Sequence, residues 1–99
     1  MDNGVLTIGE IKRRVAVPAR QHGLKKVYLF GSYARGEATP KSDIDLCVDD
    51  SNIRSLFELS GLFLDMKEAL QSNIDMVTTG GIDGEFKEKI MKEWKIIYE

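Results

Sequence analysis

FGSYARGEATPKSDIDL, residues 30–46, holds a Gly-Ser pair after an apolar run and two aspartates separated by one residue. Glycine and serine at the end of a strand indicate that something approaches the backbone closely. Paired aspartates at the start of the next strand indicate a divalent cation, for which carboxylates are preferred ligands. The stretch therefore contains either two unrelated turns or the two halves of one site.

Apolar periodicity on both sides of this stretch predicts three helices and three strands. Thr7 and Glu10 form a capping box, which predicts that the first helix begins there. Pro18 predicts a kink or a restart in that helix, and Gly23 predicts its end. The remaining elements are expected as strands at 25–30, 43–48 and 74–78, a helix at 53–71 capped by Asn52, and a final helix with an apolar stripe of Phe86, Ile90, Trp94 and Ile97.

This order, α-β-β-α-β-α, predicts a single α/β (α+β) domain over residues 1–99, with a small mixed sheet flanked by helices. The long helix between the second and third strands suits a parallel pair joined by a right-handed crossover. A connection of about a dozen residues joins the first and second strands, so these two can run antiparallel.

Three carboxylates are then expected at one edge of the sheet. Asp43 and Asp45 point the same way because alternate residues of a strand share a face. Antiparallel pairing brings them to the Gly31-Ser32 turn, and parallel pairing brings Asp75 to the same edge. Adjacent anionic groups repel each other unless a cation lies between them, and a third carboxylate allows two Mg²⁺ ions about 3.5–4 Å apart. We therefore predict one site, with Asp43, Asp45 and Asp75 as metal ligands and catalytic residues.

The anionic partner of such a site is expected on the Gly31-Ser32 turn. Gly31 has no Cβ to keep a phosphate away, and Ser32 can donate from its hydroxyl. Arg35 is either a further donor to a triphosphate or a member of a surface ion pair, and Lys41 and Ser42 are weaker candidates for nucleotide binding. The two familiar nucleotide motifs fail here, because the Walker A loop lacks its Lys-Ser/Thr pair and G-x-G-x-x-G does not occur.

Composition narrows the class of protein. Of 99 residues, 42% are hydrophobic and 30% charged, and no apolar run has the roughly 18 residues that a membrane span needs. The net charge of −2 disfavours a long nucleic-acid substrate, because phosphate binding usually requires a basic face. The stretch that begins at Met1 lacks the apolar core of a signal peptide, and Cys47, the single cysteine, is expected to be buried. We expect a cytoplasmic protein without a membrane partner.

The longer stretch LFGSYARGEATPKSDIDLCV, residues 29–48, closely resembles the signature of the minimal nucleotidyltransferases, the small members of the DNA polymerase beta superfamily. That signature is an apolar residue, Gly-Ser, a spacer, Asp-apolar-Asp-apolar, and a third acidic residue on a later strand. Gly31, Ser32, Asp43 and Asp45 match it, and Asp75 fits the third acidic position. The resemblance extends to the terminal KEWKIIYE, residues 92–99, and so covers nearly the whole chain.

By this resemblance, the protein would transfer AMP from ATP to a hydroxyl, using two Mg²⁺ ions, and release pyrophosphate. Asp43 and Asp45 would hold both ions, and Asp75 would hold the ion that activates the acceptor. Minimal members are often paired with a helical HEPN-domain protein, which implies an antitoxin that modifies a tyrosine of its toxin within a hetero-oligomer. Two alternatives stay open: the catalytic subunit of a two-protein transferase for a small hydroxylated molecule, and an antitoxin that acts by binding alone.

Overall fold

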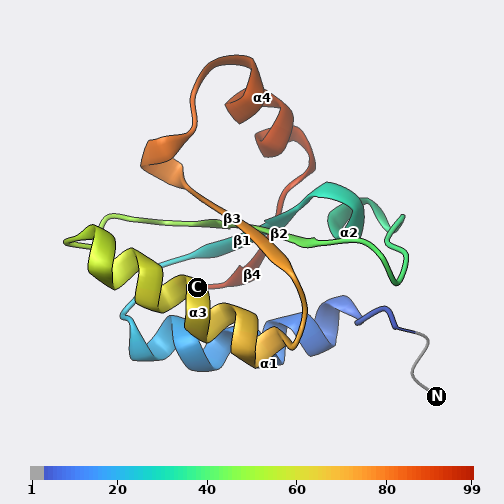
Figure 1. Ribbon diagram of the computed structural model, residues 1–99. Helices are drawn as coiled ribbons and strands as arrows, with labels where there is room; N and C mark the ends of the chain where they lie inside the picture. Colours follow the sequence, from blue (N-terminus) through green and yellow to red (C-terminus); the bar gives the residue numbers. More distant parts are fainter. Residues whose placement is uncertain (1–3) are drawn as a thin grey trace.

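The computed structural model describes residues 4–99 and is shown in Figure 1. Its elements are, in chain order, α1 (Ile8–Gln21), β1 (Val27–Phe30), α2 (Gly31–Arg35), β2 (Ile44–Val48), α3 (Leu56–Leu70), β3 (Ile74–Thr78), the 3₁₀ turn η1 (Thr79–Gly81), α4 (Gly84–Glu93) and β4 (Lys95–Tyr98). The prediction about a signal peptide rests mainly on Met1 to Asn3, which lie outside the described residues. Within residues 4–99, no helix is both long enough and apolar enough to cross a membrane.

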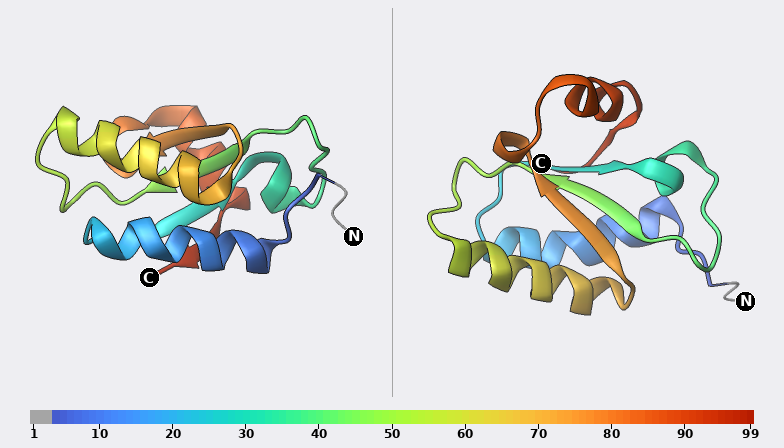
Figure 2. Two further views of the ribbon diagram at one scale, coloured as in Figure 1. Left: turned by 60° about the horizontal axis from the view of Figure 1, so that its bottom comes forward. Right: turned by 45° about the horizontal axis from the view of Figure 1, so that its top comes forward.

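In the described part of the chain, four strands form one mixed sheet in the order β3-β2-β1-β4. β1 pairs antiparallel with both β2 and β4, whereas β2 and β3 run parallel and are connected through α3. α1 and α3 lie side by side across one face of the sheet, and α4 lies over the other face (Figures 1 and 2). The predicted mixed sheet flanked by helices is confirmed, together with its antiparallel and parallel strand pairs.

Apolar side chains fill the space on both faces of the sheet. The larger core lies between the sheet and the α1–α3 layer, where Ile11, Leu29 and Leu62 are fully buried. A smaller core under α4 consists of Phe30, Cys47, Ile82 and Ile90. Cys47 has no exposed surface, so its predicted burial is confirmed. Burying one large apolar side chain stabilises a fold by about 1.5–3 kcal/mol, so the apolar side chains on both faces of the sheet contribute to the stability of the fold.

The first helix, α1, begins and ends where the sequence predicts. The Thr7 hydroxyl accepts from the Glu10 amide at 3.0 Å, and the Glu10 carboxylate accepts from the Thr7 amide, which completes the capping box. After the C-cap His22, Gly23 adopts the left-handed conformation with φ of +66°. Pro18 lies inside α1, which is continuous there, so the predicted restart does not occur and the predicted kink stays a prediction. The Pro18 side chain is buried, and this burial helps to offset the backbone hydrogen bond that a proline removes from a helix.

The long helix α3 begins at Leu56, later than predicted, because its cap is Ser55 and not Asn52. The Ser55 hydroxyl accepts from the Glu58 amide at 3.1 Å, and Ser55 has the extended backbone that an N-cap requires. Asn52 instead donates from its side-chain amide to the Gly23 carbonyl oxygen at 2.8 Å. This bond ties the turn before α3 to the end of α1.

The main error of the sequence prediction concerns the C-terminal segment. The helix predicted through Trp94 and Ile97 ends at Glu93, and Lys95–Tyr98 forms the strand β4 at the edge of the sheet. Apolar spacing in this segment fits a helix, but pairing with β1 satisfies its backbone groups, and its isoleucines suit a strand. Trp94 stacks on Tyr28 with 3.8 Å between the ring centroids.

The sequence prediction also omitted the short helix α2 from the order of elements. α2 begins at Gly31, directly after β1, and Gly36 ends it with φ of +76°. Both strands next to it start later than predicted, β1 at Val27 and β2 at Ile44. Asp43 therefore lies in the loop immediately before β2 and not in the strand.

Candidate active site

Three neighbouring strands bring the predicted site residues to one level of the sheet. Phe30 of β1 lies opposite Asp45 of β2, and Asp45 lies beside Asp75 of β3. Gly31 follows Phe30 directly, and Asp43 lies just before β2. The glycine–serine turn and the aspartates therefore meet where β1 ends and β2 and β3 begin. α2 also begins at this side of the sheet (Figure 1).

Gly31 is required both by its backbone conformation and by a neighbouring carboxylate. It is buried and has φ of +74°, a conformation that residues with a side chain rarely adopt. A Cβ atom at this position would overlap the Asp45 carboxylate and would lie 2.9 Å from its Cγ atom. The sequence predicted that Gly31 leaves room for a phosphate, but in the structure the Asp45 side chain approaches its backbone. The glycine turn and the Asp-Ile-Asp segment are thus packed as one unit.

Asp45 lies in an environment that disfavours its charge. Partial burial, and then the charges of Asp75 and Asp43, raise the pKa of the Asp45 carboxyl from its usual 3.8 to about 6. Arg35 acts in the opposite direction, and Glu93 raises this pKa further. The aspartates are therefore close enough to repel one another, and carboxyl groups perturbed in this way are common in functional sites.

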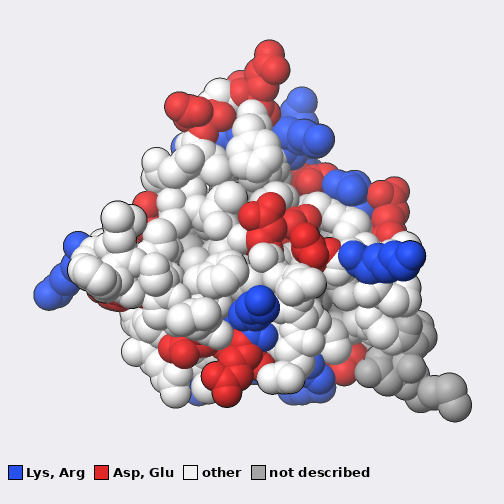
Figure 3. Space-filling model, viewed as in Figure 1, with Lys and Arg blue, Asp and Glu red and all other residues white. Residues whose placement is uncertain are grey.

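The chemistry of this cluster fits a divalent cation. Carboxylate oxygens are ligands that Mg²⁺ prefers, and a cation would relieve the repulsion that raises the Asp45 pKa. Acidic side chains gather on the surface over β2 and β3, with basic side chains near α2 (Figure 3). Within residues 4–99, no three His, Cys, Asp or Glu side chains already form a group that could hold a metal ion. The side chains of Asp43, Asp45 and Asp75 would therefore have to turn toward a bound ion.

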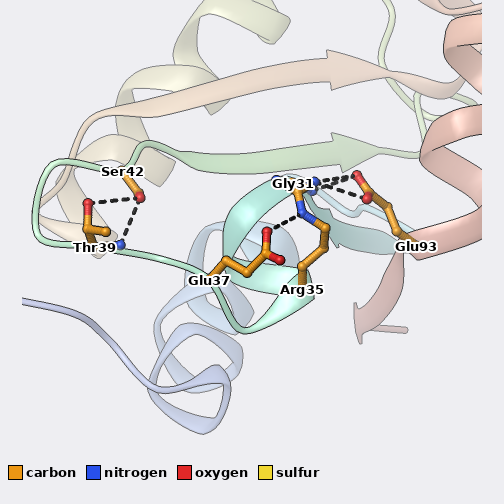
Figure 4. Close-up of polar contacts among 6 residues, drawn as sticks. All are labelled: Gly31, Arg35, Glu37, Thr39, Ser42 and Glu93. Carbon is orange, nitrogen blue, oxygen red and sulfur yellow. Dashed lines mark hydrogen bonds and ion pairs between the residues drawn. The ribbon is translucent and has the colours of Figure 1, made fainter.

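Arg35 is bound by carboxylates on two sides (Figure 4). Its Nε atom donates to Glu37 at 2.8 Å, and its Nη1 atom donates to the two carboxylate oxygens of Glu93 at 3.0 and 3.3 Å. The Glu93 carboxylate also accepts from the Gly31 amide at 3.1 Å. Of the two alternatives for Arg35, the structure contains the ion pair, and the contact with a nucleotide stays a prediction.

Ser42 lies away from this network, in the loop before β2 (Figure 4). Its hydroxyl accepts from the Thr39 amide at 2.9 Å, and the Lys41 amide donates to the Thr39 hydroxyl at 3.3 Å. These bonds hold the loop together. Among the described residues, Ser32 lines the cleft beside Gly31, but Ser42 and Lys41 do not.

A cleft of about 370 Å³ opens between α4 and the wall that holds the glycine–serine turn, Asp43 and Asp45. Among the described residues, Asp75 does not line this cleft. Small-molecule sites usually have volumes of about 300–1,000 Å³, so a nucleotide could enter with part of its structure exposed. One wall consists of Phe30, Gly31, Ser32, Arg35, Asp43 and Asp45, and the other consists of Phe86, Lys89, Ile90 and Glu93 of α4. The sequence did not predict the α4 wall, because no local pattern marks its polar residues and only the fold brings them to the motif.

Aromatic contacts hold α4 above the sheet. Phe86 meets Phe30 edge to face, with ring centroids 6.4 Å apart. Directly after α4, Trp94 stacks on Tyr28. These two contacts fix both ends of the helix over β1, and they place Glu93 beside the turn that follows β1.

The polymerase beta nucleotidyltransferase family matches residues 15–99 of this chain. The chain therefore belongs to this family of enzymes, and the family predicted from the signature at residues 29–48 is confirmed. A candidate protein adenylyltransferase of Methanocaldococcus jannaschii is 36% identical over 88 residues, which cover 89% of this chain and 95% of the relative.

Solved structures of similar proteins have the same fold. A candidate minimal nucleotidyltransferase matches with a TM-score of 0.77 at 29% identity, over 91% of this chain and 95% of the other. A chain from the complex of a tri-AMPylated Shewanella oneidensis HEPN toxin with an MNT antitoxin matches with a TM-score of 0.70 at 20% identity, over 93% of this chain and 72% of the other. The second likeness shows the fold alone. The predicted minimal nucleotidyltransferase fold is confirmed.

Proposed function

We propose that the chain is a Mg²⁺-dependent protein adenylyltransferase that transfers AMP from ATP to a tyrosine hydroxyl of a HEPN toxin and so acts as its antitoxin. The observation that carries this proposal is the strand register, which places Asp45 between the Gly31 turn and Asp75. Family membership supports nucleotidyl transfer, and the relative named as an adenylyltransferase of proteins supports a protein acceptor. The AMPylated HEPN toxin in complex with an MNT antitoxin supports the choice of partner.

The proposed transfer is a displacement at the α-phosphorus of ATP. The acceptor oxygen forms a bond to that phosphorus, the bond to the oxygen bridging to the β-phosphate breaks, and pyrophosphate leaves with the electron pair. Asp43 and Asp45 would hold two Mg²⁺ ions, and Asp75 would share the ion nearer the acceptor. Bound Mg²⁺ would neutralise charge on the phosphate oxygens and lower the pKa of a coordinated hydroxyl.

The phosphates would lie along the glycine–serine turn. The Gly31 amide, the Ser32 hydroxyl and the Arg35 guanidinium are hydrogen-bond donors on this wall of the cleft, and Lys89 adds a positive charge from α4. Asp75 is exposed on β3, an edge strand, so a partner protein could reach it. A free tyrosine has a pKa near ~10, so its phenol must lose a proton, which passes to the surrounding water, to become an effective nucleophile.

The test is to incubate the chain with ATP, Mg²⁺ and a HEPN protein encoded in a neighbouring reading frame. Intact mass spectrometry should show one or more adenylyl groups added to the HEPN protein, and a Tyr→Phe change in that protein should prevent the addition. Asp43→Asn should abolish transfer. Asp49→Asn is the matched control, because Asp49 follows the far end of β2 and should leave transfer intact.

The same experiment separates the alternatives. A HEPN protein that stays unmodified but is neutralised in a tight complex would contradict the proposal and favour an antitoxin that acts by binding alone. Transfer of AMP to a small hydroxylated molecule, with no modification of the partner, would favour the two-protein transferase. Transfer that survives the Asp43→Asn, Asp45→Asn double variant would place the metal site elsewhere.

A further inference from the structure

The Glu93 carboxylate occupies the hydrogen-bond donors that the proposed function assigns to phosphate. Its Oε1 atom accepts from the Gly31 amide at 3.1 Å, and both of its oxygens accept from Arg35 Nη1 at 3.0 and 3.3 Å. Gly31 and Arg35 belong to the glycine–serine turn and α2, whereas Glu93 comes from the end of α4 (Figure 4). The carboxylate of a residue from a distant segment thus lies where the proposed function places the phosphates of the nucleotide.

The environment of Glu93 resembles that of a bound anion. Its side chain is 20% exposed, so it is held within the cleft wall and is not free in solvent. Burial opposes its charge, but hydrogen bonds from Arg35 and Gly31 outweigh burial and hold the pKa of Glu93 below its usual range. Glu93 is therefore ionised at neutral pH, although it adds to the repulsion at Asp45. A neutral side chain would not add that repulsion.

We propose that Glu93 is an internal competitor of the nucleotide triphosphate and that it sets the affinity of the cleft for ATP. A backbone amide has one hydrogen, so the Gly31 amide cannot make a full hydrogen bond to Glu93 and to a phosphate oxygen at once. Two anions on the same donors also repel each other. ATP must therefore displace the Glu93 carboxylate from Gly31 and Arg35 before its phosphates occupy the turn. This inference rests on the proposed nucleotide-binding function.

Glu37 provides a matched control for Glu93. Both glutamates pair with Arg35, and replacing either by glutamine removes one negative charge. Glu37 binds Nε only, has a side chain that is 65% exposed, and does not line the cleft. A general effect of charge should therefore appear in both variants, whereas competition for the Gly31 amide should appear only in the Glu93 variant.

The experiment measures binding of Mg²⁺ and the non-hydrolysable analogue AMP-PNP to three proteins by calorimetry: the unchanged chain, Glu93→Gln and Glu37→Gln. Removal of a charged competitor should lower the Kd of Glu93→Gln by about three- to ten-fold, and Glu37→Gln should change it by less than about two-fold. The Gly31 amide resonance should also move in Glu93→Gln without ligand, because its acceptor changes. The side chain of Glu93→Asp is too short for its carboxylate to reach both Gly31 and Arg35, so this variant should lower the Kd as well. It replaces Glu93→Gln in the experiment if Glu93→Gln fails to fold.

An unchanged or weaker affinity of Glu93→Gln would overturn the inference and make Glu93 a residue that positions Arg35 for the nucleotide. An equal gain from Glu37→Gln would also overturn it, because net charge would then explain the effect. If none of the three proteins bound the analogue, the result would contradict the proposed function itself, and with it the inference about Glu93. Tighter binding of the analogue by Glu93→Gln, without tighter binding by Glu37→Gln, would support the role of Glu93 as a competitor.

Discussion

Asp45→Asn should stabilise the metal-free protein at neutral pH, although it removes a proposed metal ligand. The Asp45 pKa is about 6 in the folded chain, because the carboxyl is partly buried and faces Asp75 and Asp43. In the unfolded chain it should return to its usual value of 3.8. Between these two pH values the folded protein keeps a proton that the unfolded chain releases, so the free energy of unfolding falls as the pH rises from about 4 to 6. Asparagine has no charge and removes this loss.

The size of the effect follows from the pKa difference. About two pKa units correspond to roughly 3 kcal/mol at full strength, at 1.36 kcal/mol per unit. Solvent screens a half-buried carboxyl, so we expect a gain of about 1–2 kcal/mol for Asp45→Asn above pH 6. In a domain of this size that corresponds to an increase in Tm of roughly 4–15 °C. Well below the unfolded-state pKa of 3.8, both proteins carry a neutral side chain and the difference should vanish.

The measurement is urea unfolding followed by circular dichroism between pH 4 and 7.5, with EDTA present throughout. Asp49→Asn is a control of opposite sign, because hydrogen bonds from Ser51 hold the pKa of Asp49 below its usual range. Asp49 therefore stabilises the folded state above pH 4, and its replacement should lower stability there. The reasoning on Asp45 would be refuted if Asp45→Asn were no more stable than the unchanged chain at pH 7.5, or if its advantage grew on acidification.

Two further predictions concern the local structure. Gly31→Ala should destabilise the fold more than Gly36→Ala: both glycines have left-handed backbones, which costs alanine about 1–3 kcal/mol, but only at Gly31 would the Cβ also overlap the Asp45 carboxylate. Equal losses in urea unfolding would contradict this account of the Gly31–Asp45 contact. Thr7→Ala should cost about 1 kcal/mol by losing the cap of α1, and an unchanged midpoint of unfolding would show that the capping box does not contribute.

The sequence predicts features that depend on short-range contacts. The capping box of Thr7 and Glu10 and the end of α1 at Gly23 follow from side chains within one turn of each other. Alternation of aspartate with apolar residues predicts the face of β2, and the lengths of the connections predict the directions of β1, β2 and β3. Those directions are enough to bring Asp45 and Asp75 to the same level of the sheet.

The sequence does not predict features that depend on long-range packing. Trp94 and Ile97 continue a helical spacing, but β1 has a free edge for Lys95–Tyr98, and strand pairing prevails over local periodicity. Glu93 carries no local signal, because the Gly31 amide that donates to it lies 62 residues away in sequence. The contact of Gly31 with Asp45 was not predicted for the same reason, since the carboxylate that requires a glycine there comes from another strand. The approach of a phosphate to Gly31 stays a prediction.

The C-terminal segment therefore shapes the site as much as the signature does. The signature supplies Gly31 and Asp45, but a cleft exists only because α4 forms its second wall. α4 is held there because β4 pairs with β1 and because Phe86 packs against Phe30. Glu93 lies between these two anchors, so its carboxylate can leave the donors only by turning its side chain or by moving the end of α4. Turning the side chain breaks its three hydrogen bonds to Gly31 and Arg35. Moving the helix would also strain the β4 pairing, so the side chain should move first. On the proposed function, nucleotide entry would then require a local change beside β1 and not an opening of the sheet.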